Sequence, residues 1–151
     1  RGSTTHMSLY TYRAKLARIV DGDTIDVNLD QGLNTWRLPE RCRLAGIEAE
    51  KTGTPEGDTA RTAVEEWFRG VGDTFYVQTL KNRREQERKE KYGRYLAWIY
   101  DVEPEWPAPT RQGDADVLAN IARMACLNTA LILGGHAVWY WGVGPRRADV
   151  E

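Results

Sequence analysis

The stretch RCRLAGIEAEKTG, residues 41–53, brings an arginine and several acidic side chains close together in the chain. Arg43 lies in an otherwise apolar run, where a guanidinium is costly to bury without an anionic partner. Glu48 and Glu50 follow it, and carboxylates near an arginine can bind a metal ion and take a proton from water. The stretch therefore predicts a catalytic edge that faces a phosphate. An exposed strand edge or a structural ion pair would account for Arg43 equally well.

A second acidic cluster is the segment VDGDT, in which Asp21 and Asp23 flank one glycine. Asp-Gly favours a tight turn, so the segment predicts a turn between two strands. Carboxylate oxygens on such a turn suit a hard cation such as calcium, which takes several oxygen ligands. Most Asp-Gly pairs are turns without a metal ion, and this segment alone leaves both interpretations open.

Two further segments have side chains that could contact a nucleic acid. In EKYGR, residues 90–94, the guanidinium of Arg94 could hold a phosphate through two hydrogen bonds. Lys91 could add a positive charge there and Tyr92 a stacking face, although such a charge run also fits a solvated loop. The aromatic group at residues 139–141 predicts either hydrophobic packing or a platform on which bases of a single strand stack.

The elements that must position these side chains follow from the hydrophobic pattern. Ile25, Val27 and Leu29 alternate with polar residues, which indicates a half-buried strand. Pro39 interrupts the next extended run and predicts a bulge or a sheet edge. Strands are predicted over residues 10–20, 25–29, 36–47, 73–80 and 95–102, helices over 54–70 and 117–132, and an irregular aromatic segment over 136–144.

The order of these elements predicts the fold: three strands, a helix, two strands and a helical region. Five strands with turn residues between them predict an α+β fold, mainly β, in which a five-stranded OB-fold barrel carries two to three packed helices. The apolar stripe from Val117 to Ile132 fits one helix or two abutting helices that end at Gly134. A length of 151 residues fits a single domain, predicted over residues 7–151, with residues 1–6 assigned to an expression-tag remnant.

Composition and charge restrict the functional classes. The formal net charge is -1, with 21 basic and 22 acidic residues, so any contact with nucleic acid must come from local clusters rather than from a globally basic surface. Cys42 and Cys126 make neither a disulfide framework nor a metal cluster, and both are predicted to be buried free thiols. No apolar run is long enough to span a membrane and no signal peptide is visible, which predicts a protein without membrane contact. The free cysteines favour an intracellular protein, predicted to be cytoplasmic, with an exported protein whose signal has been removed as the alternative.

The motifs described above, taken in order, resemble the staphylococcal nuclease (thermonuclease) family. The resemblance rests on VDGDT, then RLAGIEA, then KYGRYLAWIY, then LNTALILGGHA, and covers residues 12–141. It implies an OB-fold barrel with packed helices. It also implies calcium-dependent hydrolysis of phosphodiester bonds in DNA and RNA, with little sequence specificity. The implied partner is single-stranded or unwound nucleic acid, with no obligate protein partner.

The resemblance also assigns roles to individual positions, each an expectation for this chain. Asp23 and Glu48 match the two carboxylates that bind the metal ion, and Ala49 matches the residue that offers its backbone carbonyl. Arg43 and Arg94 match the two arginines that clamp the phosphate. The positions that match residues near the substrate are Lys91, Tyr92 and Trp141.

One departure from the family pattern concerns the catalytic glutamate. An ungapped overlay puts Lys51 at that position, and a lysine is cationic at neutral pH and cannot do the work of a carboxylate. An overlay that deletes the family proline puts Glu50 there instead, and this is the alignment we prefer. Glu56 is a third candidate that would need the loop to fold back. If Lys51 occupies the position, the chain is an impaired nuclease that binds nucleic acid without cutting it.

Overall fold

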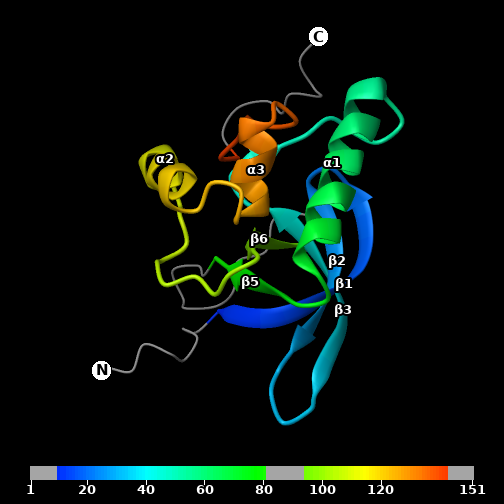
Figure 1. Ribbon diagram of the computed structural model, residues 1–151, viewed down its shortest axis with the longest axis vertical. Coiled ribbons are helices and arrows are strands. Elements are labelled where there is room, and N and C mark those ends of the chain that lie inside the picture. Colours follow the sequence, from blue (N-terminus) through cyan, green and yellow to red (C-terminus); the bar gives the residue numbers. More distant parts are fainter. Residues whose placement is uncertain (1–9, 81–93, 143–151) are drawn as a thin grey trace.

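The barrel predicted from the sequence is present in the computed structural model, which describes residues 10–80 and 94–142. Neighbouring strands pair in the order β1-β2-β3-β6-β5 and close into a barrel. The three helices gather to one side of it, and the tip of the β2–β3 hairpin extends away from them (Figure 1). The barrel strands are β1 (Thr11–Asp21), β2 (Thr24–Asp30), β3 (Trp36–Leu44), β5 (Phe75–Thr79) and β6 (Tyr95–Tyr100).

The β1–β2–β3 meander follows the predicted pattern of alternation and turns. Ile25, Val27 and Leu29 of β2 are all buried, which confirms the period-two strand. The β2–β3 register shifts between the pairs Val27↔Glu40 and Leu29↔Arg37, so one extra residue of β3 is accommodated around Pro39. This is the bulge that the proline predicts, because it cannot donate to the ladder.

Two ladders close the barrel. β1 pairs antiparallel with β5 over residues 11–14. β3 pairs parallel with β6 through Cys42↔Tyr95, Arg43↔Leu96 and Leu44↔Ala97. The parallel ladder is short, and it sets the end of β3 beside the start of β6.

Helix α1 (Pro55–Val71) has the signals of a helix start that its sequence predicts. Thr54 is the N-cap, its hydroxyl accepts a hydrogen bond from the Gly57 amide, and Pro55 occupies the first position of the helix. One face of the helix is buried against the barrel, and it consists of Gly57, Ala60, Val64 and Phe68.

The second helical region consists of two helices, one of the two alternatives that its apolar stripe allows. They are α2 (Gln112–Ile121) and α3 (Leu127–Leu133), separated by a short non-helical segment. The amide of Gly134 donates back to the carbonyl of Ala130 at the end of α3, where the stripe predicts the stop. The break lets α3 pack against β6 and α1 while α2 takes a different direction (Figure 1).

Two local predictions were wrong. The third strand was predicted to run through Ile47, but β3 ends at Leu44 and a turn follows in which Gly46 has φ +77°. The chain then forms the two-residue strand β4 (Ile47–Glu48). The segment predicted to be irregular contributes β7 (Val138–Trp139), which pairs antiparallel with β4. A partner so distant in the sequence leaves no local signal.

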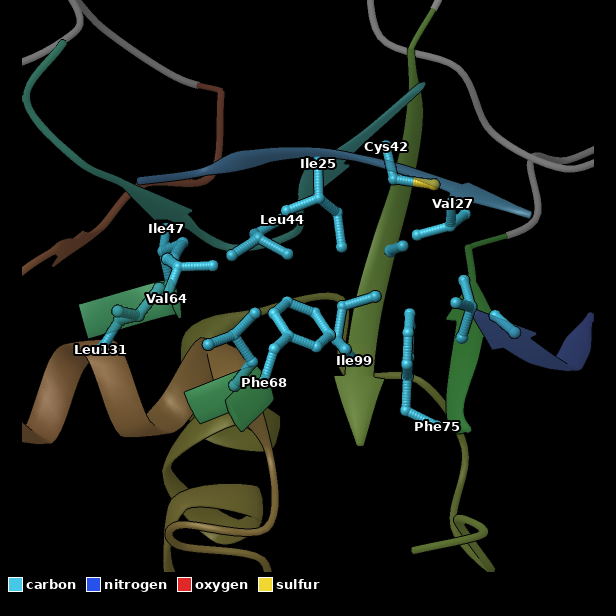
Figure 2. Close-up of a cluster of buried hydrophobic side chains, with 14 of the residues drawn as sticks. Ile25, Val27, Cys42, Leu44, Ile47, Val64, Phe68, Phe75, Ile99 and Leu131 are labelled. Atoms are coloured by element: carbon cyan, nitrogen blue, oxygen red, sulfur yellow. The ribbon is translucent and has the colours of Figure 1, made fainter. Parts of the chain in front are cut away.

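The barrel interior and the inner faces of α1 and α3 share one hydrophobic core (Figure 2). Phe68 of α1 packs edge-on against Phe75 of β5, with ring centroids 4.9 Å apart. Cys42 and Cys126 are buried free thiols, as predicted. Burial raises the pKa of the Cys126 thiol to about 12, so the group stays protonated at neutral pH.

Candidate functional site

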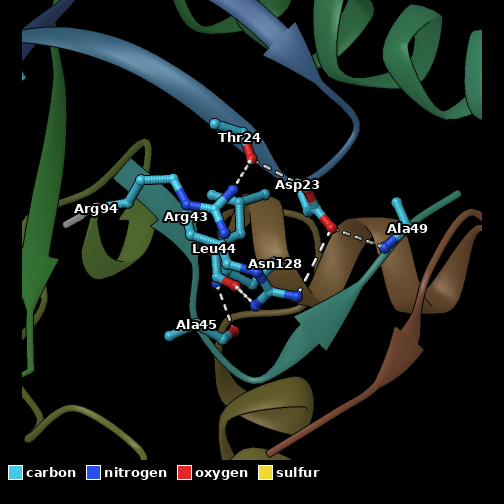
Figure 3. Close-up of polar contacts among 8 residues, drawn as sticks. All are labelled: Asp23, Thr24, Arg43, Leu44, Ala45, Ala49, Arg94 and Asn128. Atoms are coloured by element: carbon cyan, nitrogen blue, oxygen red, sulfur yellow. Dashed lines mark hydrogen bonds and ion pairs between the residues drawn. The ribbon is translucent and has the colours of Figure 1, made fainter. Parts of the chain in front are cut away.

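The residues predicted to carry chemistry come from three elements that meet at one end of the barrel (Figure 3). Asp23 lies in the turn between β1 and β2, and Thr24 begins β2. Thr24 pairs with Arg43 of β3. The parallel β3–β6 ladder brings the start of β6, and with it Arg94, to the same place. The β-sheet pairings thus bring together side chains that are far apart in the sequence.

Asp23 is the centre of this cluster. Its residue is 5% exposed, and its Oδ2 accepts a hydrogen bond from the Ala49 amide at 3.1 Å. Its Oδ1 accepts one from the Thr24 hydroxyl at 3.1 Å. The Nη2 of Arg43 lies 3.7 Å from Oδ2, an ion pair longer than a hydrogen bond. The Asp23 carboxylate therefore contacts both the guanidinium of Arg43 and the backbone amide of Ala49, and it holds the two in place.

Arg43 is a buried arginine that contacts a carbonyl oxygen and an aromatic ring as well as Asp23. Its side chain is 7% exposed. Nη1 donates to the carbonyl oxygen of Leu44 at 3.4 Å, which is long for a hydrogen bond. The guanidinium carbon lies 5.9 Å from the centre of the Tyr140 ring, within the range of a cation–π contact. These contacts hold the guanidinium in place and suit it to a second anion.

Arg94 approaches the same cluster from the start of β6. Its Nη1 lies 3.3 Å from the hydroxyl oxygen of Thr24, to which it donates. That hydroxyl in turn donates to Asp23, so a continuous polar chain runs from Arg94 through Thr24 and Asp23 to Arg43 (Figure 3). Two guanidiniums beside one buried carboxylate can receive a phosphate group through several charge-assisted hydrogen bonds.

The glycine of the VDGDT turn lets the turn pack directly on its neighbours. A Cβ atom built on Gly22 would lie 2.7 Å from the Cβ of Ala60 in α1 and 3.0 Å from the Cβ of Ala49. Any side chain would therefore push the turn away from the helix and from the segment after β4. The close approach sets where Asp23 lies relative to that segment.

The segment after β4 carries the alternative catalytic positions. Glu48 is 1% exposed, and its strand pairs with Val138 of β7. Glu50 is half-buried, whereas the side chain of Lys51 is exposed. Glu56 lies in the exposed first turn of α1. Of the three candidates for the catalytic position, Glu50 therefore has the least exposed side chain.

The carboxylate oxygens of Asp23 and Glu48 determine which kind of metal ion could bind at this site. Asp23 and Glu48 are buried carboxylates, and the amide of the residue after Glu48 contacts Asp23 directly. Within residues 10–80 and 94–142, no group of three or more His, Cys, Asp and Glu side chains is placed to hold a metal ion. The donor set fits a hard cation such as calcium, provided that water, a backbone carbonyl or a substrate phosphate completes its coordination.

The predicted substrate contacts fall in different parts of the structure. Lys91 and Tyr92 lie outside the described residues. Trp141 stacks on Trp139, with ring centroids 6.1 Å apart and planes 11° apart. Its Nε1 also donates to the side-chain oxygen of Gln112 in α2 at 2.9 Å. Trp141 thus belongs to an aromatic stack over α2, while Tyr140 is the aromatic residue that faces Arg43.

Sequence reasoning gave no site role to Tyr140 or Asn128. Tyr140 was considered only as part of an aromatic group, and its amide donates to the carbonyl of Gly46 at 2.7 Å. Asn128 is fully buried, and its Nδ2 donates to the carbonyl of Ala45 at 2.9 Å, two residues after Arg43. Two signals were available for Asn128: its amide side chain lies inside an otherwise apolar helical stripe, and it belongs to the motif LNTALILGGHA.

Comparison with known proteins gives low-identity relatives. No protein-family model matches the chain. It is 32% identical to a thermonuclease of Staphylococcus intermedius over 103 residues, which is 65% of this chain and 53% of the relative. It is 34% identical to a micrococcal nuclease of Shigella flexneri over 89 residues, 59% of this chain and 42% of the relative. It is 28% identical to Protein ParB of Escherichia coli over 142 residues, 92% of this chain and 63% of the relative.

The matches to the thermonuclease and the micrococcal nuclease indicate a distant relationship to thermonuclease-like proteins. The aligned region spans between 42% and 63% of the length of these three relatives. In the described part of the chain, no helix has the length and apolar character needed to span a membrane.

Proposed function

We propose that this chain is a calcium-dependent nuclease that hydrolyses phosphodiester bonds in DNA or RNA with little sequence specificity. The observation that carries the proposal is the convergence of Arg43 and Arg94 on the buried carboxylate of Asp23. The names of two of the relatives, thermonuclease and micrococcal nuclease, support the same activity.

The two arginines would bind the attacked phosphate. One hydrogen bond of each goes to a neutral oxygen at a long distance, 3.4 Å for Arg43 and 3.3 Å for Arg94. Phosphate oxygens would make shorter, charge-assisted hydrogen bonds in their place. As the phosphorus becomes five-coordinate, the guanidiniums would stabilise the charge that develops on its equatorial oxygens.

Asp23, Glu48 and the backbone carbonyl of Ala49 would hold the calcium ion. When bound, the ion would supply charge neutralisation at the phosphate and orient a water molecule. Both carboxylates are buried, and that of Asp23 is already held by two local hydrogen bonds, so it would need little reorganisation on binding. Asp23 would also keep the guanidinium of Arg43 oriented toward the phosphate.

Glu50 would act as the general base that takes the proton from the attacking water. Its position next to Ala49 and its half-buried side chain support this role over Lys51, whose side chain is exposed. The backbone carbonyl of Lys51 accepts a hydrogen bond from the Thr54 hydroxyl at 3.0 Å, which ties that residue to the start of α1. We therefore favour the alignment in which the family proline is deleted.

The substrate would be single-stranded or unwound, because the attacked phosphate must reach the guanidinium of Arg43, which is buried, beside that of Arg94, which is partly buried. Tyr140 lies next to Arg43 and would offer a stacking face to a base beside that phosphate. Lys91, Tyr92 and Trp141 remain proposed substrate contacts.

A second candidate function is a module that binds nucleic acid without cutting it. One observation favours it: among the described residues, no third side-chain ligand joins Asp23 and Glu48 as a possible metal site. In this case the arginines would bind phosphate, and no group would activate water.

Cleavage of a labelled single-stranded DNA distinguishes the two functions. We expect wild-type protein to cut it with calcium and to stop when a chelator is added. Glu50→Gln should abolish cutting, whereas Glu56→Gln, a matched change at an exposed glutamate, should leave it intact. Binding without cutting, unaffected by calcium, would establish the second function. Cutting that is lost in Glu56→Gln and survives in Glu50→Gln would move the general base to α1.

A further inference from the structure

Both aspartates of the VDGDT turn bind backbone amides of the same loop. Asp23 Oδ2 accepts from the Ala49 amide at 3.1 Å, and Asp21 Oδ1 accepts from the Thr52 amide at 3.2 Å. Only Glu50 and Lys51 lie between the two bound amides. The turn therefore holds both ends of the short span that presents Glu50.

The loop is also tied to helix α1 on its other side. The Gly53 amide donates to Asp58 Oδ1 at 2.9 Å, and the Thr54 hydroxyl donates to the carbonyl of Lys51 at 3.0 Å. A Cβ atom on Gly57 would lie 1.7 Å from that carbonyl oxygen, so the first turn of the helix rests directly against the loop. These contacts fix the loop after Lys51, and the two amide contacts with the turn fix it on either side of Glu50 and Lys51.

A span without proline needs such external restraint. Glu50 is flanked by Ala49 and Lys51, neither of which restricts the backbone as a proline would. Side-chain acceptors on a packed turn can supply the restraint instead. The turn is itself immobilised, because Gly22 allows it to lie against Ala49 and α1.

We propose that Asp21 is a positioning residue, which fixes the backbone at Thr52 and thereby aims Glu50 at the attacking water. This inference rests on the proposed nuclease function. The role requires an acceptor oxygen on the side chain and does not require its negative charge. It therefore differs from a role in metal binding, for which the charge is essential.

Three variants separate the hydrogen bond from the charge. Asp21→Ala removes both, whereas Asp21→Asn keeps an oxygen that can accept from the Thr52 amide and loses the charge. The matched control is Asp30→Ala, which removes a similar contact in the hairpin away from the site, where the Gly32 amide donates to Asp30 Oδ1 at 2.8 Å.

The first measurement is amide hydrogen exchange, without calcium or nucleic acid. We expect the Thr52 amide to exchange about tenfold faster in Asp21→Ala than in wild type, since the side-chain acceptor of its hydrogen bond is lost. Asp21→Asn and Asp30→Ala should leave the Thr52 rate within about threefold of wild type, because each keeps the acceptor at position 21. Unchanged exchange in Asp21→Ala would overturn the proposal whether or not the protein is a nuclease.

The second measurement is steady-state cleavage of single-stranded DNA. We expect kcat to fall about 10- to 100-fold in Asp21→Ala with KM unchanged, the effect of a misplaced catalytic group. Asp21→Asn should restore kcat to within about threefold of wild type, as the geometry is retained. An Asp21→Asn variant as impaired as Asp21→Ala would overturn the proposal in favour of a charge effect.

Two further outcomes are also decisive. If the wild-type protein does not cut DNA, the proposed nuclease function fails. The exchange rate of the Thr52 amide then still tests whether Asp21 holds the backbone at Thr52. If Asp21→Ala does not fold, Asp21→Asn carries the test, and faster Thr52 exchange in that variant would overturn the proposal.

Discussion

Replacing Asn128 with alanine should remove a connection between helix α3 and two barrel strands. Asn128 is 0% exposed. Its Nδ2 donates to the carbonyls of Ala45 at 2.9 Å and Ala97 at 3.1 Å, and its Oδ1 accepts from the Ile99 amide at 3.1 Å. The side chain thus binds the end of β3, which carries Arg43, to β6 and α3.

The cost follows from the partners that alanine would leave behind. The Ala97 carbonyl keeps a hydrogen bond from the Ala45 amide at 2.8 Å. The Ala45 carbonyl and the Ile99 amide lose the contact that Asn128 gave them. A buried backbone group without a partner costs about 1–3 kcal/mol, so the free energy of unfolding should fall by about 2–6 kcal/mol. This is a large part of the about 5–15 kcal/mol typical of a domain.

Urea unfolding followed by tryptophan fluorescence measures this difference. The midpoint should fall with an unchanged slope, which indicates a change in stability rather than in the unfolded state. Asn120→Ala, at an exposed position of α2, is the matched control and should stay within about 0.5 kcal/mol of wild type. A loss below about 1 kcal/mol in Asn128→Ala would refute the reasoning, since it would mean that the two groups find other partners.

Three other predictions concern the loop, the phosphate site and pH. Gly57→Ala, with its Cβ 1.7 Å from the Lys51 carbonyl, should lower the free energy of unfolding by about 1–3 kcal/mol in urea, whereas Gly70→Ala in the open part of α1 should not lower it. Arg43→Lys keeps the charge but loses the planar fork, so the rate of DNA cleavage should fall about 100-fold, and unaltered cleavage would contradict the phosphate role. Burial raises the pKa of the Cys126 thiol to about 12, so the thiol ionises at a lower pH in the unfolded chain than in the folded one. The contribution of this thiol to the free energy of unfolding should be fully present below about pH 8.5 and should decrease from there up to pH 12, by as much as about 1.4 kcal/mol per pH unit. Urea midpoints between pH 8 and 11 test this, and Cys126→Ala should make the decrease shallower.

The elements with local signals could be predicted from the sequence. The alternation of apolar and polar residues predicted β2, and the N-cap Thr54 followed by Pro55 predicted the start of α1. The pairing of β4 with β7 could not be predicted, because a two-residue strand has no period and its partner lies near the other end of the chain. The turn at Gly46 was missed for a similar reason, since the apolar residues on both sides of it continue the pattern of a strand.

The candidate site divides in the same way. Motif order identified Asp23, Arg43 and Arg94 as candidates, and the structure brings all three together. The place of Tyr140 against Arg43 depends on the β4–β7 pairing, which sequence patterns do not contain. The hydrogen bond from Thr52 to Asp21 depends on how closely two loops approach. That distance is set by the packing of Gly22 on α1 and not by either loop alone.

The short parallel ladder between β3 and β6 has a consequence for how the molecule folds. Its three residue pairs join segments separated by α1 and β5 in the chain, so a long loop must close before any of these contacts can form. Contacts of this kind are slow to form and come late in folding. This ladder brings the start of β6, with Arg94, beside Thr24 and Arg43. A partly folded chain, even one with its β1–β2–β3 meander and α1 complete, would therefore lack the proposed phosphate site, and binding of a phosphate there should arise in the same kinetic step as barrel closure.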